Sequence, residues 1–210
     1  MTARYPVYLF DVDGTLVDSA DDICGAILEA LKPTRANGLG QADLRSYVGV
    51  SLLRMFQELL PEYTPAQHEE LVRTYRSTYV ARGHRSTRVF PGVSEALRGL
   101  GGRKSTATTK GTATTRAVLE QFGLAAYFDH VQGTDGFAYK PAPDVILASL
   151  TALNASPQEC LLVGDSPADM EAGRRAGVAI CAVRYGYGDP AGMARFEPDL
   201  WVSDLRELLG

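Results

Sequence analysis

The sequence predicts an α/β protein with a parallel sheet, into which an all-helical segment is inserted. Three observations lead to this fold class. Short apolar runs alternate with helical patterns, which is typical of a parallel sheet covered on both faces. No strand pattern occurs between residues 16 and 88. The chain has 210 residues and is 45% hydrophobic, which is enough to bury a core without disulfides or a structural metal.

The expected strands are apolar runs that end in polar or glycine-rich residues, and the expected helices carry apolar residues on one face. The strands are Val7–Phe10, Ser105–Thr108, His130–Gln132, Leu161–Val163, Val178–Val183 and Leu200–Val202. The helices between them are Ser94–Leu100, Thr112–Phe122, Pro143–Leu153 and Ala168–Ala176. Because a helix separates most of these strands, we expect the strands to run parallel.

The inserted segment is expected to be helical throughout. The predicted boundaries assign residues 1–15 and 89–210 to the α/β domain and residues 16–88 to the insertion. Ser19 is expected to start the first inserted helix, with Asp22 three residues later as a partial capping box. Further inserted helices are expected at Asp43–Val48, Leu52–Leu60 and Pro65–Arg82.

Composition excludes several classes of protein. The sequence has 25 acidic and 21 basic residues, whereas nucleic-acid-binding proteins usually present a concentrated basic surface. No apolar stretch approaches the about 18 residues that cross a membrane, and the first ten residues lack a signal-peptide pattern. We therefore expect a cytoplasmic protein that binds neither nucleic acid nor membrane. Cys24, Cys160 and Cys181 lie in apolar contexts without C-x-x-C spacing, so we expect buried, reduced thiols.

The first motif with chemical potential follows the first strand. Asp11 and Asp13 are two residues apart on an extended chain, so their side chains point to the same side. Gly14 allows a sharp turn and lets backbone N–H groups approach a ligand. One alternative is an acidic turn without function. Another is a calcium loop, but such a loop has its glycine at the sixth position rather than the fourth.

A second acidic motif follows a later strand, where Gly164 and Asp165 precede a predicted helix that contains Asp169. The alternative is a plain helix start capped by Ser166 or Asp165. Together with Asp11 and Asp13, these carboxylates would repel one another unless a divalent cation lay among them. Oxygen ligands favour magnesium over zinc. None of the histidines has ligand spacing; they are His68, His84 and His130.

Two further strand or turn motifs carry a hydroxyl and a positive charge. Thr108 ends a threonine-rich strand, and Lys140 precedes Pro141 in a stiffened turn. The alternatives are a strand end that caps the next helix and a turn that starts one. Each alternative is reasonable for its motif alone.

The order of the four motifs resembles the haloacid dehalogenase superfamily over the whole chain. The order is Asp11 to Thr15, then Thr108, then Lys140 to Asp144, then Gly164 to Asp169. The resemblance implies a three-layer Rossmann-like core, with residues 16–88 as a helical cap inserted after the first motif.

The same resemblance implies roles for the motif residues. Asp11 would be the nucleophile that takes the phosphoryl group, and Asp13 the general acid and then the base. Mg²⁺ would be held by Asp11, the backbone carbonyl of Asp13 and Asp165. Asp169 would be either a further ligand or an orienting residue beside the metal.

Phosphate binding is implied for four residues of the same motifs. The side chains of Thr108 and Lys140 would hold the non-transferring phosphoryl oxygens. Thr109, which stands where related phosphatases commonly have Asn, would contribute its backbone N–H. Gly14 would let backbone N–H groups approach the phosphate.

Residues of the implied cap are expected to select the substrate. The loop Tyr47–Ser51, preceded by Arg45, resembles the phosphoglycolate phosphatase group. Phosphosugar mutases place Arg directly after this loop, whereas this chain has Leu52 there and Arg54 later. The candidate specificity residues are Arg45, Tyr47, Gly49, Ser51 and Arg54.

The resemblance favours a Mg²⁺-dependent phosphatase that hydrolyses a small phosphorylated metabolite, with phosphoglycolate as the best single substrate. Dehalogenase members of the superfamily lack a carboxylate at the position of Asp13. Thr15 resembles the residue that phosphatase members have at that position. The alternatives are a sugar-phosphate phosphatase, a phosphosugar mutase and a non-enzymatic phosphate-binding protein. A receiver-type phospho-switch is disfavoured because such domains are a single unit of about 120 residues without a cap. A monomer and a homodimer are both compatible with the sequence.

Overall fold

The computed structural model describes residues 5–210, and the chain forms two compact units. We call residues 5–18 with 88–210 the core unit, and residues 19–87 the helical unit. The first boundary lies after Asp18 rather than after Thr15. The reason is a two-stranded antiparallel sheet, β2 (Val17–Asp18) with β3 (Arg88–Val89), which belongs to the core unit. The prediction that residues 16–88 contain no strand was therefore wrong.

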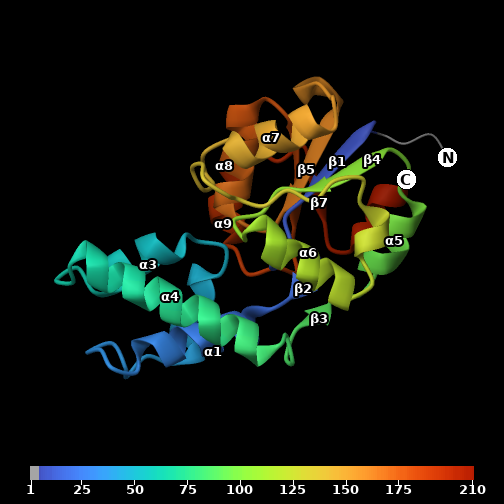
Figure 1. Ribbon diagram of the computed structural model, residues 1–210. Helices are drawn as coiled ribbons and strands as arrows, with labels where there is room; N and C mark the ends of the chain where they lie inside the picture. The colour runs from blue at the N-terminus through green and yellow to red at the C-terminus, as the bar shows by residue number, and fades with distance from the viewer. Residues whose placement is uncertain (1–4) are drawn as a thin grey trace. The chain divides into compact units, whose positions relative to one another are not determined.

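The core unit contains a parallel five-stranded sheet in the order β4-β1-β5-β6-β7 (Figure 1). Its strands are β1 (Val7–Phe10), β4 (Arg103–Thr106), β5 (Cys160–Gly164), β6 (Ala179–Val183) and β7 (Leu200–Val202). The predicted α/β fold class with a parallel sheet is thereby confirmed.

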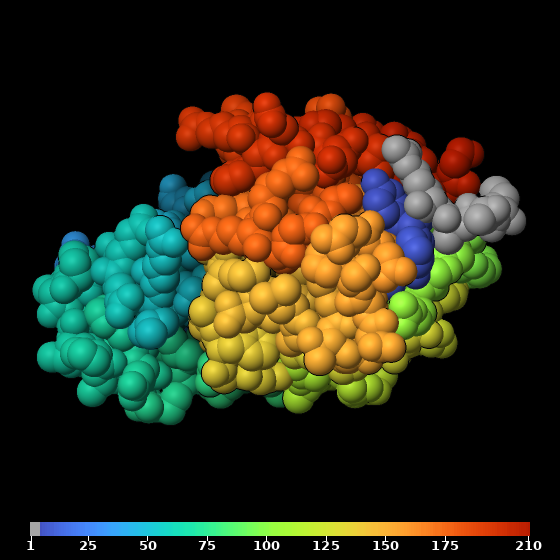
Figure 2. All heavy atoms as spheres, turned by 90° about the horizontal axis from the view of Figure 1, so that it is seen from above, coloured from blue at the N-terminus to red at the C-terminus, as the bar shows by residue number. Residues whose placement is uncertain are grey.

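Helices cover both faces of this sheet (Figure 1). Alternate residues of β1 point to opposite faces, and all of them are buried, so the whole strand is apolar. Tyr8 and Phe10 pack with α5 (Val93–Gly99), α6 (Thr112–Gln121) and η4 (Leu205–Leu209). Val7 and Leu9 pack with α7 (Asp144–Ala152), α8 (Pro167–Ala176) and α9 (Pro190–Ala194). In Figure 2 the orange surfaces of α7 and α8 lie side by side. Two short 3₁₀ helices complete the unit, η2 (Ala125–Tyr127) and η3 (Pro157–Glu159).

The strand predicted at His130–Gln132 is absent from the described sheet. His130 forms only an isolated bridge with Ser105. The Thr106 hydroxyl instead accepts the Gln132 N–H at 2.8 Å and donates to the Gln132 carbonyl at 2.9 Å. A side chain therefore takes the hydrogen bonds that a ladder would need. β4 also ends at Thr106, so Thr108 lies in the loop beyond the strand.

The helical unit consists of α1 (Ala20–Leu31), α2 (Gln41–Leu44), η1 (Arg45–Tyr47), α3 (Leu52–Leu59) and α4 (Pro65–Arg82). α1 packs against α4. Within α4, the rings of Tyr75 and Tyr79 stack with their centres 5.7 Å apart. Ser19 precedes α1 but its side chain caps nothing, contrary to the prediction. Asp22 turns instead to the Ser86 N–H, at 2.9 Å.

The three cysteines are buried and free of disulfides, as expected. Within residues 5–210, none of the helices is both long and apolar enough to cross a membrane.

Candidate active site

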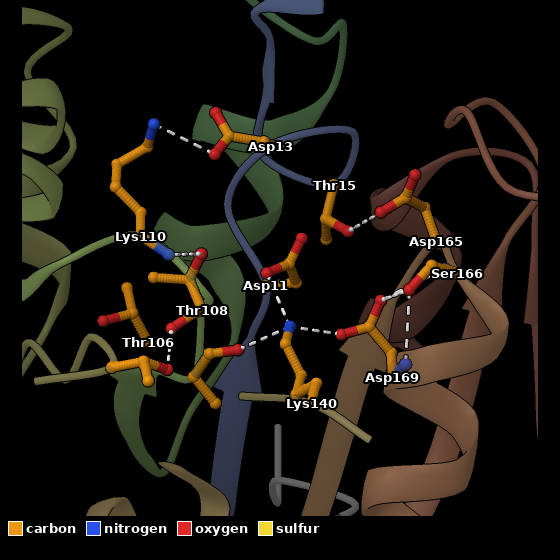
Figure 3. Close-up of polar contacts among 12 residues, drawn as sticks. Asp11, Asp13, Thr15, Thr106, Thr108, Lys110, Lys140, Asp165, Ser166 and Asp169 are labelled. Carbon is orange, nitrogen blue, oxygen red and sulfur yellow. Dashed lines mark hydrogen bonds and ion pairs between the residues drawn. The ribbon is translucent and has the colours of Figure 1, made fainter. Parts of the chain in front are cut away.

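The motif residues meet at the carboxyl ends of neighbouring strands in the core unit (Figure 3). Asp11 follows β1, the loop with Thr108 follows β4, and Asp165 follows β5. β1 lies between β4 and β5 in the sheet. Parallel strands present their carboxyl ends at one edge, which is where α/β proteins bind ligands. The sheet order therefore brings together residues that are 150 positions apart, such as Thr15 and Asp165.

Lys140 lies among the buried carboxylates. Its ammonium donates to Asp11 Oδ1 at 2.8 Å and to the Ala107 carbonyl at 3.0 Å, and it also forms an ion pair with Asp169. Burial by itself lowers the pKa of Lys140, but the carboxylates of Asp11 and Asp169 more than offset this, so its pKa is raised. Lys140 therefore carries a fixed positive charge beside Asp11.

Three carboxylates form a cluster suited to a divalent cation. One oxygen from each of Asp11, Asp165 and Asp169 lies within 4.8 Å of the others. Burial raises the pKa of Asp11 to about 6 despite the nearby Lys140. Burial, with the charges of Asp11 and Asp169, raises the pKa of Asp165 well above its usual range. Buried oxygen donors that repel one another fit a hard cation such as Mg²⁺.

Asp165 is oriented by uncharged donors. The Tyr187 N–H donates to Oδ2 at 2.8 Å, and the Thr15 hydroxyl donates to Oδ1 at 3.3 Å. Gly14 packs against the same carboxylate, since a Cβ at this position would lie 2.3 Å from Asp165 Oδ2. Gly14 also has φ of +92°, a backbone conformation that favours glycine. The absence of a side chain at Gly14 thus leaves room for the Asp165 carboxylate.

Asp169 has two roles in the geometry. Its Oδ2 accepts the Ser166 hydroxyl at 2.5 Å and the Ser166 N–H at 3.1 Å, which completes a capping box at the start of α8. Its Oδ1 pairs with Lys140. Asp169 therefore caps the start of α8 and also lies in the predicted site. The capping box fixes the orientation of its side chain.

Lys110 is a second cation of the site and was not among the residues predicted from the sequence. Its Nζ forms an ion pair with Asp13 Oδ2 at 3.1 Å, and Figure 3 marks this pair with a dashed line. Both side chains are less than a tenth exposed. The available signal was a lysine two residues after Thr108 in the loop at the strand end. Asp13 is therefore held beside a positive charge other than that of Lys140.

Thr108 lies in the same loop as Lys110. Thr134 donates its hydroxyl to the Thr108 carbonyl at 2.9 Å, and the Thr108 hydroxyl accepts the Lys110 N–H at 3.4 Å. Thr108 is buried, whereas the following Thr109 is half-buried. The loop is thus fixed at Thr108 and opens toward solvent one residue later.

The candidate specificity residues lie in the helical unit, between η1 and α3 and on those elements. The Tyr47 hydroxyl donates to Glu58 of α3 at 2.9 Å. The Val50 N–H donates to the Tyr47 carbonyl at 3.0 Å, which closes a turn. Substrate contact by Arg45, Tyr47, Gly49, Ser51 and Arg54 stays a prediction.

Comparisons with known proteins match this chain over most of its length. The model of the family described as haloacid dehalogenase-like hydrolase matches residues 8–183. A phosphoglycolate phosphatase from Aquifex aeolicus is 32% identical, covering 86% of this chain and 85% of that protein. The pyrophosphatase PpaX of Listeria innocua is 30% identical, covering 100% of this chain and 97% of that protein.

Solved structures share the fold as well. The crystal structure of a predicted phosphatase from Clostridium acetobutylicum has a TM-score of 0.90 at 28% identity, covering 98% of this chain and 96% of that one. The family match spans the strand ends that carry Asp11, Thr108 and Asp165. The resemblance noted from the sequence motifs is therefore confirmed. This chain belongs to the haloacid dehalogenase-like hydrolase family, and it is a phosphatase.

Proposed function

We propose that this protein is a Mg²⁺-dependent phosphatase that hydrolyses a small phosphomonoester through an aspartyl-phosphate intermediate, with 2-phosphoglycolate as the favoured substrate. The observation that carries the proposal is the buried arrangement of aspartates and lysines at the strand ends. Asp11, Asp165 and Asp169 form a carboxylate cluster in which Asp11 and Asp169 share the ammonium of Lys140, and Asp13 pairs with Lys110. A cytoplasmic location and a monomeric or homodimeric state stay predictions.

Charge balance supports a divalent cation in this site. Four buried aspartates lie near two lysines, which leaves an excess of negative charge before any substrate enters. We propose that Asp11, Asp165 and the backbone carbonyl of Asp13 hold Mg²⁺, with Asp169 as a further ligand or as an orienting residue. The ion would neutralise phosphoryl and carboxylate charge.

The proposed chemistry begins with Asp11. Its carboxylate oxygen forms a bond to phosphorus as the bond between phosphorus and the ester oxygen breaks. Asp13 gives its proton to the departing oxygen, which leaves as an alcohol. Asp13 then takes a proton from water, whose oxygen attacks the phosphorus and releases inorganic phosphate and the Asp11 carboxylate.

The remaining site residues are proposed to hold the phosphoryl group. Lys140 would bind a non-transferring oxygen, and the Thr108 hydroxyl would donate to another. Thr109 would place its backbone N–H near the same oxygens. The N–H of Gly14 itself donates to the Val17 carbonyl at 2.9 Å, so Gly14 would act by letting the backbone of its turn approach the phosphate. The fixed charge of Lys140 beside Asp11 supports this assignment, because preorganised donors stabilise charge that develops in the transition state.

The substrate assignment rests on the relatives and on the loop after η1. The relative from Aquifex aeolicus is named a phosphoglycolate phosphatase, but PpaX, named a pyrophosphatase, is nearly as similar. Pyrophosphate is therefore the second candidate, on the strength of that match. Mutase chemistry on a sugar phosphate is less favoured because Leu52 replaces the mutase arginine. Hydrolysis of a sugar phosphate stays an alternative.

A substrate panel tests the proposal. Phosphate release would be measured with Mg²⁺ for 2-phosphoglycolate, pyrophosphate, a hexose phosphate and p-nitrophenyl phosphate. We expect the highest kcat/KM for 2-phosphoglycolate and no turnover by Asp11→Asn. Asp21→Asn, which removes an exposed carboxylate of α1, is the matched control and should be fully active. Turnover by Asp11→Asn, or turnover that is unaffected by a chelator, would contradict the proposal.

A further inference from the structure

A loop of the core unit, residues 184–189 between β6 and α9, closes against Asp165. The Tyr187 N–H donates to Asp165 Oδ2 at 2.8 Å. A Cβ at Gly186 would lie 2.2 Å from the Asp165 Cβ, and a Cβ at Gly188 would lie 2.0 Å from the Asp165 carbonyl oxygen. Real Cβ contacts are never this short. The two glycines on either side of Tyr187 therefore allow the backbone to reach the carboxylate.

The same loop is held from its other side by two tyrosine hydroxyls. Tyr185 donates to the Thr15 carbonyl at 2.8 Å, and Tyr187 donates to Asp18 Oδ1 at 2.6 Å. Thr15 in turn donates its hydroxyl to Asp165 Oδ1. The loop thus connects the segment that follows Asp11 and Asp13 with the carboxylate at the end of β5.

We propose that Tyr187 is a positioning residue for the metal ligand Asp165, and that its hydroxyl bond to Asp18 fixes the loop so that the Tyr187 N–H holds the carboxylate. This rests on the proposed function in one respect, the binding of Mg²⁺ by Asp165. An uncharged N–H orients the carboxylate without adding a positive charge that would compete with the cation. Partners that orient a ligand in this way commonly change metal affinity by about 10- to 100-fold.

The bond is tested with the metal-free full chain and MgCl₂ by titration calorimetry, without substrate. Tyr187→Phe keeps the ring and the N–H and removes only the hydroxyl bond to Asp18. Because the hydroxyl acts through the backbone, we expect the lower end of that range, about a tenfold rise in the Mg²⁺ dissociation constant. Asp18→Leu should produce the same rise, and the double variant should be no worse than either.

Asp18→Asn retains an acceptor oxygen, so it should bind Mg²⁺ like the unmodified chain. Tyr127→Phe, whose hydroxyl accepts a hydrogen bond from Arg98 away from the site, is the matched control and should also be unchanged. If Tyr187→Phe lowers the melting temperature of the metal-free protein but leaves Mg²⁺ affinity unaltered, the role is structural and the inference is overturned.

Comparing Asp165→Asn with Tyr187→Phe distinguishes a wrong role for Tyr187 from a wrong metal site. If Asp165→Asn loses Mg²⁺ binding while Tyr187→Phe binds it normally, only the role of Tyr187 is refuted. If Asp165→Asn binds Mg²⁺ as well as the unmodified chain, the proposed metal site is wrong, and the role of Tyr187 falls with it.

Discussion

Both units bury aspartate side chains, but they balance the charge differently. In the helical unit Asp22 is 1% exposed and accepts from the Ser86 N–H at 2.9 Å, the Thr87 hydroxyl at 2.8 Å and Arg82 Nε at 3.3 Å. A single cation, Arg82, therefore faces this single carboxylate. In the core unit, Asp11 and Asp169 share the single ammonium of Lys140.

This difference separates a structural aspartate from a functional cluster. Asp22 has the hydrogen bonds that a buried carboxylate requires. It lies near the start of the helical unit's sequence and its donors lie near the end, so it links the first and last segments of that unit. The core cluster keeps the carboxylates of Asp11, Asp165 and Asp169 close without matching their charge, which is unfavourable for folding alone. Such an imbalance is typical of sites that bind a cation or carry out proton transfer.

The largest effect is expected from removing the shared cation. Lys140→Ala should retain the fold but lower kcat/KM by about 10³-fold, because a fixed charge near the transferring phosphoryl group is lost. Circular dichroism and phosphate release measure the two properties. Lys104→Ala is the matched control, since Lys104 is a buried lysine of the same unit that donates to the Leu100 carbonyl at 2.6 Å. It should cost stability and leave turnover unchanged. Near-normal turnover of Lys140→Ala would remove Lys140 from the mechanism.

The next effect concerns the balanced carboxylate. Asp22→Leu should lower the free energy of unfolding by about 2–3 kcal/mol, because the Ser86 N–H, the Thr87 hydroxyl and Arg82 lose a buried acceptor. Denaturant unfolding measures the change. Mg²⁺ affinity should be unaltered, as measured by titration calorimetry. A loss of Mg²⁺ binding in this variant would contradict the division between a structural and a functional aspartate.

The sequence predicted the carboxylates of the site better than their partners. Asp11, Asp13, Asp165 and Asp169 stand beside apolar strands or at a helix start, and these local patterns can be recognised without tertiary structure. Lys110 was missed because nothing local shows that its side chain reaches Asp13.

Long-range pairing explains the other differences. The role of the Tyr187 N–H depends on the approach of a loop 22 residues away from Asp165 in the chain. β2 and β3 have two residues each, too few for a hydrophobic pattern, and are defined only by their pairing. The apolar pattern at His130–Gln132 predicted a strand, but the Thr106 side chain took its hydrogen bonds.

A smaller effect is expected from pH, because protons and Mg²⁺ compete for the cluster. The pKa of Asp11 is raised to about 6, so the folded chain keeps a proton that the unfolded chain releases between about pH 4 and 6. The stability of the metal-free protein should therefore fall as pH rises through this window. At pH 5 Asp11 is mostly protonated, and the pKa of Asp165 is raised as well, so Mg²⁺ should bind more weakly at pH 5 than at pH 7.5.

Thermal unfolding with and without Mg²⁺ at both pH values checks this expectation. The increase in melting temperature on adding Mg²⁺ should be larger at pH 7.5 than at pH 5. Asp11→Asn provides the control, since it removes one of the two carboxylates with a raised pKa and should reduce the pH dependence. An equal increase at both pH values would show that Mg²⁺ does not displace a proton from the cluster.

The smallest effect is expected in the helical unit, at Tyr47. Its hydroxyl bond to Glu58 is exposed, so Tyr47→Phe should change the free energy of unfolding by less than about 0.5 kcal/mol. If the loop Tyr47–Ser51 selects the substrate, the same variant should raise KM for 2-phosphoglycolate a few-fold and leave p-nitrophenyl phosphate hydrolysis unchanged. Glu58→Gln, which keeps an acceptor for the hydroxyl, should match the unmodified enzyme. Equal KM values for Tyr47→Phe and the unmodified enzyme would make this hydroxyl a surface contact only, and substrate selection would then depend on other residues of the helical unit.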